Sequence, residues 1–286
     1  MSGPGRPQPL RLLPALLLLV GCVGGTGRTA AAAVRDVAIV GTAFRITLDD
    51  GRVLEGDALI GAVLEAADTE GNPLTVRIDG HRPDPLDPSG ETVLYALSTP
   101  DPATGAWRQL CEPGPDGLRM GFPVAGAWTA TGEHVPAPGA FGLTCTAGAI
   151  GKCVRFGYRP WRTAGGRTLW DHHQACVRLV RADYCGDGLG HTRTGTPIDL
   201  YDRLGIQRDE PAPGMDFEAG WTPSGASCVR HVRVRGEASL MELERRCPAR
   251  LAGRTGAGCT EAEAARAPDV LLFNRSSDPL SAGRQP

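Results

Sequence analysis

The sequence predicts an α+β protein, with a small antiparallel β-rich part at residues 34–110 and a mixed α/β, disulfide-cross-linked C-terminal domain at residues 111–273. Three observations support this fold class. Apolar residues alternate with polar ones in the first part, as they do in half-buried strands. Helix-spaced apolar residues and helix caps begin in the second part. The second part also holds eight of the nine cysteines.

Residues 1–21 have the pattern of a lipoprotein signal peptide. Arg6 and Arg11 form a weakly basic start, and the apolar run at residues 12–20 is too short to span a bilayer. The run ends in Leu19-Val20-Gly21-Cys22, which resembles a bacterial lipobox. Cys22 is therefore the expected site of lipid attachment, and the N-terminal lipid would anchor the protein in a membrane.

The residues after Cys22 suggest a destination. Val23, in place of an acidic residue, favours an outer-membrane or cell-surface lipoprotein, and residues 22–33 then serve as a tether of small residues. The alternative is an ordinary signal peptide cleaved near Thr29, which would make the protein periplasmic.

Three spans of alternating residues lie in the β-rich part, at 44–48, 74–78 and 93–97, and a further strand is expected at 107–110. Asp50-Gly51 offers a tight hairpin turn after the first span, and Asp79-Gly80 is expected to end the second. We expect this antiparallel sheet to cover and support the region that follows.

The second part begins with a Pro/Gly-rich loop after Cys111. Short strands are expected around Trp128 and at residues 141–144, and a short helix is expected at residues 149–156, ended by Gly157. The clearest helix follows, with Asp171 as N-cap and Gln174 completing a capping box. Gly186 would end it, which makes residues 182–185 its last turn.

The C-terminal region predicts two further helices and one strand. The first helix spans residues 237–247 and stops at Pro248, and the second begins with the capping box of Thr260 and Glu263. Residues 270–273 form a candidate buried strand, and the polar residues 274–286 are expected to be a disordered tail.

The cysteine pattern agrees with export. An even number of cysteines behind a signal peptide indicates disulfides, although eight cysteines allow 105 pairings and the sequence selects none of them. No two are spaced as a zinc site requires, so we expect neither a metal nor a cofactor. The eight are Cys111, Cys145, Cys153, Cys176, Cys185, Cys228, Cys247 and Cys259.

Charge and composition exclude one class of partner. The formal net charge is −2, which argues against non-specific nucleic-acid binding. The expected partners are the membrane, through the N-terminal lipid, and an unknown envelope ligand or protein.

The segment "RADYCGDGLGHTRTGTPIDLYD" at residues 181–202 concentrates the functional side chains, and three interpretations compete. In the first, His191 shuttles protons and Asp183 or Asp187 orients it. In the second, Asp187 and Asp199 bind Ca²⁺, although the EF-hand order of ligands is missing. In the third, which we favour, the acidic and hydroxyl residues stabilise local turns and Cys185 ties the segment to another part of the chain.

The same segment resembles the signature of the ADYC domain, a bacterial family named for Ala182-Asp183-Tyr184-Cys185. The resemblance extends over roughly residues 111–259, with weaker similarity in the β-rich part. It is carried by "GKCVRFGYRPW" (151–161), "HHQACVRLV" (172–180), "FEAGWTPSGASCVRHVR" (217–233) and "ERRCP" (244–248). The resemblance implies an exported, cysteine-bearing bacterial protein and names no substrate.

These observations lead to two hypotheses of function. The first is an exported, lipid-anchored envelope protein that acts by binding or as a structural component. The alternative is an envelope hydrolase centred on Asp183, Asp187 and His191.

Overall fold

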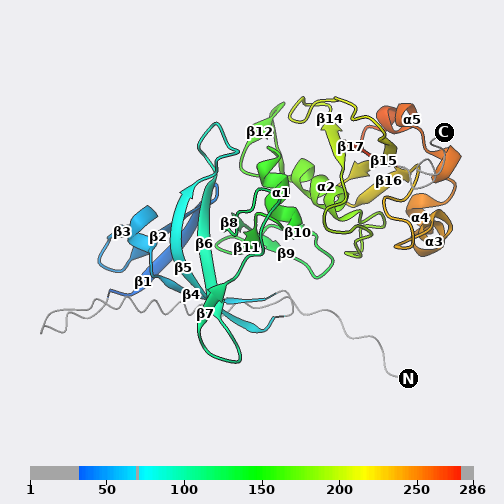
Figure 1. Cartoon of the computed structure of the whole chain (residues 1–286). Coiled ribbons are helices and arrows are strands. Elements are labelled where there is room, and N and C mark those ends of the chain that lie inside the picture. The colour runs from blue at the N-terminus through cyan, green and yellow to red at the C-terminus, as the bar shows by residue number, and fades with distance from the viewer. Residues whose placement is uncertain (1–31, 69–70, 278–286) are drawn as a thin grey trace, which may run out of the picture.

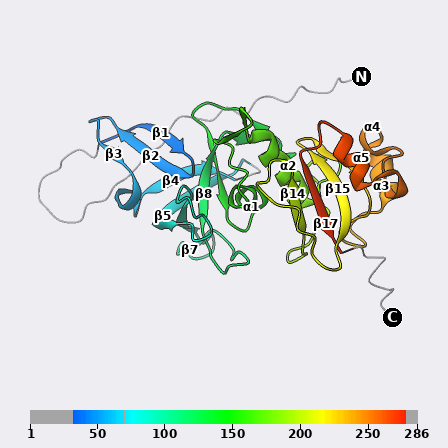
Figure 2. The same cartoon turned by 90° about the horizontal axis from the view of Figure 1, so that it is seen from above.

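The computed structural model describes residues 32–68 and 71–277. The predicted signal peptide, Cys22 and most of the predicted tether lie outside the described residues, as do residues 278–286. The molecule is elongated, with β1–β3 at one end and α3–α5 at the other in both views (Figures 1 and 2).

Two antiparallel sheets form the N-terminal end and share one apolar core. The first sheet has the order β1-β2-β3, and the second has the order β11-β8-β6-β5-β4, with β7 also paired to β6. Phe44, Ile46, Val76, Leu97 and Phe122 are among the buried residues of this core. The strands are β1 (Val34–Val40), β2 (Ala43–Leu48), β3 (Val53–Leu54), β4 (Val63–Ala67), β5 (Pro73–Pro83), β6 (Val93–Pro100), β7 (Trp107–Gln109), β8 (Gly121–Ala125) and β11 (Phe141–Cys145).

The alternation of residues at 44–48 predicts β2 correctly, because Phe44, Ile46 and Leu48 are all buried. The Asp50-Gly51 turn is also confirmed, with Gly51 at φ +84°. The predicted end of a strand at Asp79-Gly80 is wrong. Strand β5 continues to Pro83 through a β-bulge, where the register with β6 shifts between Ile78 and Gly80.

The second sheet continues beyond residue 110, where the sequence pattern changes. β8 pairs with β6 at Tyr95 and Gly121, and β11 pairs with β8 along its whole length. The small hairpin of β9 (Ala127–Trp128) and β10 (His134–Val135) interrupts the connection from β8 to β11. β9 and β11 confirm the strands expected near Trp128 and at 141–144.

The C-terminal end is built on a four-stranded antiparallel sheet with the order β14-β17-β15-β16. Helix α2 packs against β15, β16 and β17, and α3, α4 and α5 lie at the far end of the molecule (Figure 2). The strands are β14 (Asp199–Asp202), β15 (Asp216–Thr222), β16 (Gly225–Val229) and β17 (Leu272–Ser276). The helices are α1 (Ala149–Arg155), α2 (Trp170–Arg181), α3 (Leu240–Arg246), α4 (Pro248–Leu251) and α5 (Glu261–Arg266). The described residues also form two short 3₁₀ helices, η1 (Gly56–Leu59) and η2 (Gly256–Gly258), and a small hairpin of β12 (Thr163–Ala164) and β13 (Arg167–Thr168).

All eight predicted cysteines form disulfides, and the structure supplies the pairing that the sequence leaves open. The pairs are Cys111–Cys145, Cys153–Cys176, Cys185–Cys247 and Cys228–Cys259. The second pair joins α1 to α2, and the third joins the ADYC segment to the end of α3.

The predicted start of α2 is wrong. Asp171 lies inside the first turn, the N-cap is Leu169, and no side chain caps it. Gln174 is buried because its amide bridges to the β9–β10 hairpin: its Oε1 accepts from the His134 N–H at 3.1 Å, and its Nε2 donates to the Gly132 carbonyl at 2.9 Å.

The ends of the other helices follow their capping chemistry. Gly157 follows α1 at φ +98°, and Thr260 with Glu263 forms the predicted capping box of α5. The predicted helix at 237–247 is shorter, because Ser239 and Glu242 form a second capping box that starts α3 at Leu240.

The predicted tail begins too early. Asn274, Arg275 and Ser276 belong to β17, a central strand, and all three are buried. The side chains of Asn274 and Arg275 have internal partners, so a polar sequence here does not mean a disordered one. Arg275, for example, forms ion pairs with Asp199, Asp209 and Glu261.

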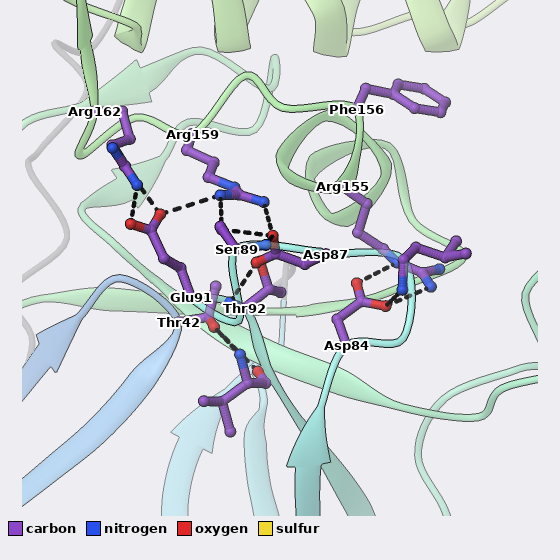
Figure 3. A network of polar contacts seen from close by, with 12 residues as sticks. Thr42, Asp84, Asp87, Ser89, Glu91, Thr92, Arg155, Phe156, Arg159 and Arg162 are labelled. Atoms are coloured by element: carbon purple, nitrogen blue, oxygen red, sulfur yellow. Dashed lines mark hydrogen bonds and ion pairs between the residues drawn. The ribbon is translucent and has the colours of Figure 1, made fainter.

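An ion-pair network joins the N-terminal sheet to the helical region (Figure 3). Arg155, at the end of α1, bonds Asp84 at 2.7 Å and Asp116 at 2.6 Å. Arg159 pairs with Asp87 at 2.6 Å in the loop between β5 and β6. Asp84 and Asp87, which both lie in this loop, are buried. We call these contacts, together with the pairing of Arg159 and Arg162 to Glu91, the junction network.

Candidate functional site

The ADYC segment leaves α2 through a Schellman motif rather than forming its last turn. The Ala182 N–H donates to the Leu179 carbonyl and the Asp183 N–H to the Arg178 carbonyl, both at 2.9 Å. Ala182 adopts φ +50°, and among the described residues it is the one non-glycine with positive φ. Glycine is usual at this position, but Ala182 is fully buried and its methyl group packs in the core.

Asp183 is a buried structural acid. Its Oδ2 accepts from the Arg178 guanidinium at 2.6 Å and from the Gly188 N–H at 3.0 Å. Both side chains are almost completely buried, with relative exposures of 3% for Arg178 and 0% for Asp183. Arg178 also donates to the carbonyl oxygens of Thr131 and Pro223, so it joins three segments of chain.

Tyr184 belongs to a second buried polar cluster. Its hydroxyl donates to Glu218 at 3.1 Å and accepts from the Arg233 N–H at 2.9 Å. Glu218 and Arg233 form a fully buried ion pair at 3.0 Å. Asn274 donates to Glu218 and accepts from the Trp221 indole, each at 2.7 Å.

The charge states of this cluster follow from its contacts. Burial raises the pKa of Glu218, but the charge of Arg233 and the hydrogen bonds to the carboxylate outweigh it, so the pKa lies below its usual value. Burial and the neighbouring Glu218 raise the pKa of Tyr184 well above its usual value, which keeps the hydroxyl protonated as a donor.

Two glycines allow the ADYC segment to lie against other loops. A Cβ on Gly186, at φ +72°, would lie 1.7 Å from the Ser224 carbonyl oxygen in the turn between β15 and β16. A Cβ on Gly188 would lie 2.8 Å from the Thr131 Cα. The "GDG" spacing therefore reflects close backbone packing.

The three candidate catalytic residues do not form a hydrogen-bonded set. Asp183 is held by Arg178 and the Gly188 N–H, whereas the exposed Asp187 accepts the Leu189 N–H at 3.1 Å and pairs with Arg246 at 2.7 Å. The His191 Nδ1 bonds the backbone carbonyl of Glu237 at 3.0 Å. Both acids thus bond backbone N–H groups of their own turn, which agrees with the structural interpretation.

The calcium interpretation used Asp187 and Asp199. Asp187 pairs with Arg246, whereas Asp199 lies in β14 and pairs with Arg275. Asp202, at the end of the same strand, accepts from the Tyr158 hydroxyl at 2.8 Å and from the Gln207 N–H. Within residues 32–68 and 71–277, no three His, Cys, Asp or Glu residues are grouped to hold a metal ion.

A groove lies between the loop after the ADYC turn and α3. It has a volume of about 410 Å³, and six of its lining residues are Leu189, His191, Glu237, Ala238, Leu243 and Arg245. His191 is 6% exposed and stacks on Tyr184, with 5.9 Å between ring centroids. Its Nε2 is buried and has no hydrogen-bond partner in the part of the chain that the structure describes. We call this the ADYC groove.

Sequence patterns did not reveal Glu218, Arg233 and Asn274, which carry the second buried cluster. The first two lie inside the "FEAGWTPSGASCVRHVR" segment that resembles the ADYC family, so the resemblance marked the segment without giving these residues a role. The sequence places Asn274 in the expected C-terminal tail. Its role depends on the pairing of β17 with β15, which brings residues more than fifty positions apart together.

Among the described residues, no helix is long and apolar enough to cross a membrane. The comparison with family models finds the ADYC domain at residues 56–235, which includes the whole second N-terminal sheet as well as the ADYC turn. Searches of curated proteins and of solved structures found no match.

Proposed function

Since the chain belongs to the ADYC domain family, we propose that it is an exported, lipid-anchored protein of the bacterial cell envelope that acts by binding or as a structural component. One observation carries the proposal: all eight cysteines after residue 110 are paired in four disulfides. Disulfides persist in oxidising compartments, among them the bacterial periplasm and cell surfaces.

The lipobox-like residues before Cys22 supply the second part of the proposal, the anchor. A diacylglycerol group on this cysteine would hold the protein at a membrane, because each buried CH₂ contributes about 0.8 kcal/mol and two acyl chains give stable attachment. Val23 favours the outer membrane or the cell surface as the location, and the periplasm is the alternative.

Mass spectrometry of the purified mature protein tests the anchor and the disulfides together. We expect a lipid adduct on Cys22 and four bridges after non-reducing digestion. The variant Cys22→Ser should lose the adduct and leave the membrane fraction, whereas Gly24→Ser, which adds a hydroxyl two residues away, should keep both. Free thiols in the folded wild-type protein would contradict an exported, oxidised state.

The alternative hydrolase hypothesis receives less support from the geometry. A catalytic His needs a partner that orients it, but His191 is oriented by a backbone carbonyl, and Asp183 is fully buried in an ion pair. A panel of ester, phosphate and glycoside model substrates separates the two functions. Turnover by the wild-type protein that His191→Ala abolishes without loss of stability would establish the hydrolase instead.

A further inference from the structure

The ADYC groove has one charged group whose hydrogen-bond donors the protein leaves free among the described residues. The Glu237 carboxylate pairs with Arg193 at 2.7 Å, the Glu242 carboxylate accepts from Ser239 in the capping box, and Arg246 pairs with Asp187. Arg245 also lines the groove, and it makes no ion pair or hydrogen bond with any residue that the structure describes. Arg245 interacts electrostatically with the exposed Glu242 carboxylate, but its N–H donors have no hydrogen-bond acceptor among the described residues and are available to a ligand.

The rest of the groove is suited to an apolar body. Leu243 and Ala238 line it from α3 and the residues just before it, and Leu189 lines it from the ADYC loop. Leu189 is 48% exposed and therefore accessible to a ligand. A volume of about 410 Å³ falls within the usual range of about 300–1,000 Å³ for small-molecule sites.

His191 adds a second unused group. Its Nδ1 bonds the Glu237 carbonyl, and its Nε2 is left without a partner among the described residues although it is buried. Buried polar atoms are normally hydrogen-bonded. A ligand in the groove would lie beside this ring.

We propose that the ADYC groove binds a small organic carboxylate with an apolar body, with the Arg245 guanidinium holding the carboxylate and Leu189, Ala238 and Leu243 contacting the body. Arginine suits this role because its planar fork bonds both oxygens of a carboxylate. The inference deepens the binding role proposed above and rests on it, but it does not depend on the lipid anchor.

Sodium octanoate and 1-octanol are suitable probes for titration calorimetry of the mature full-length protein. Octanoate should bind saturably at concentrations below about 10 mM, and octanol, which lacks the charge, should bind at least about fivefold more weakly. The variant Arg245→Gln should weaken octanoate binding by about fivefold or more. Arg266→Gln, at the equally exposed last turn of α5, is the matched control and should have no effect.

A pair of charge variants at one exposed position gives an independent test. Leu189→Glu and Leu189→Lys both replace the leucine with a long side chain, and the two side chains carry opposite charges, so the difference between them reports mainly electrostatics. Octanoate should bind Leu189→Lys more tightly than Leu189→Glu. Equal binding by these two variants, equal affinity for octanoate and octanol, or equal effects of Arg245→Gln and Arg266→Gln would each overturn the proposal. Absence of octanoate binding would also overturn it. The lipid adduct on Cys22 is measured separately, and its presence does not depend on this result.

Discussion

Tyr184 and Asp183 lie where a polar group has its largest effect on stability. Both are completely buried. Tyr184 has partners from segments distant in the sequence, whereas Asp183 bonds Arg178 and the Gly188 N–H beside its own turn. A buried donor or acceptor that loses its partner costs the full desolvation of that group, whereas a surface group regains its bond from water. The family signature is therefore explained by stability before any chemistry is invoked.

Tyr184→Phe removes one hydroxyl and leaves the Glu218 carboxylate and the Arg233 N–H each one bond short. We expect a loss of about 1–3 kcal/mol in the free energy of unfolding, measured by urea denaturation. Tyr201→Phe is the comparison, because the Tyr201 hydroxyl bonds Glu261, whose side chain is 40% exposed. Its effect should be smaller, and an equal loss in both variants would contradict the special role of the buried cluster.

Asp183→Ala should be more damaging, because it leaves the buried Arg178 guanidinium without a counter-charge. Removal of one partner from a buried ion pair costs about 3–5 kcal/mol. Asp187→Ala, four residues later, removes an exposed carboxylate and should cost less than about 1 kcal/mol. The midpoints of chemical denaturation measure both changes. If the two variants were equally stable, the structural assignment of Asp183 would be wrong.

The ADYC turn and the β15–β16 hairpin fit together through backbone contact, which makes a sharp prediction for Gly186. Gly186→Ala places a methyl carbon 1.7 Å from the Ser224 carbonyl oxygen and adds backbone strain at φ +72°. We expect a loss of more than about 3 kcal/mol or failure to fold. Gly195→Ala is the control: its φ is +85°, but nothing lies within 4 Å of the added Cβ. Thermal denaturation of this control should show a cost of about 1 kcal/mol from strain alone.

The elements that the sequence predicted best are those stabilised locally. The capping box of Thr260 and Glu263 and the alternation of Phe44, Ile46 and Leu48 depend on residues that are close in the chain. The predicted ends of α2 are wrong because tertiary contacts override the local rules of helix capping. Gln174 bonds the β9–β10 hairpin instead of capping its own helix, and packing pays for the positive φ of Ala182.

The candidate site also divides into local features, which the sequence predicts, and long-range contacts, which it does not. The sequence marked the ADYC segment, and the favoured structural interpretation of its acids agrees with their contacts. The partners Glu218, Arg233 and Asn274 could not be predicted, because sheet pairing brings them together across the fold. The ADYC groove was equally hidden, since its second wall is a helix more than forty residues further along the chain.

At the scale of the whole molecule, the junction network makes the free energy of unfolding depend on pH in the acid range. Burial raises the pKa of Asp87, but hydrogen bonds from Ser89, Arg159 and Thr92 outweigh it and hold the pKa well below its usual value. A carboxyl whose folded pKa is lowered stabilises the fold above its unfolded pKa of about 4, and this contribution is lost as the pH falls below that value.

Asp87→Asn should therefore be less stable than the wild-type protein at pH 7, and the difference should shrink as the pH falls from about 4 to about 2. Urea midpoints at a series of pH values measure this. Asp49→Asn is a control at an exposed position and should change the stability at pH 7 much less than Asp87→Asn does. A constant difference for Asp87→Asn would show that the junction network does not lower the pKa of this carboxyl.

The four disulfides differ in how far a reductant can reach them. Both halves of Cys185–Cys247 are partly exposed, whereas each of the other pairs has at least one almost completely buried cysteine: Cys111, Cys153, Cys176 or Cys259. Thiol–disulfide exchange requires a thiolate to reach a sulfur atom. Limited reduction of the folded protein should therefore open Cys185–Cys247 first.

Opening this bridge should also loosen the groove, because it joins the ADYC turn to the end of α3. The bridge spans 62 residues, and its loss should cost about 4 kcal/mol from chain entropy. The exposed Asp187–Arg246 pair, which links the same two segments, is too weak to replace it. Brief treatment with a dithiol, alkylation and peptide mass spectrometry should find label first on Cys185 and Cys247. In the variant Cys185→Ala/Cys247→Ala the rapid phase of labelling should vanish. Earlier labelling of any buried pair would mean that the C-terminal end opens by unfolding before the reductant reaches the exposed bridge.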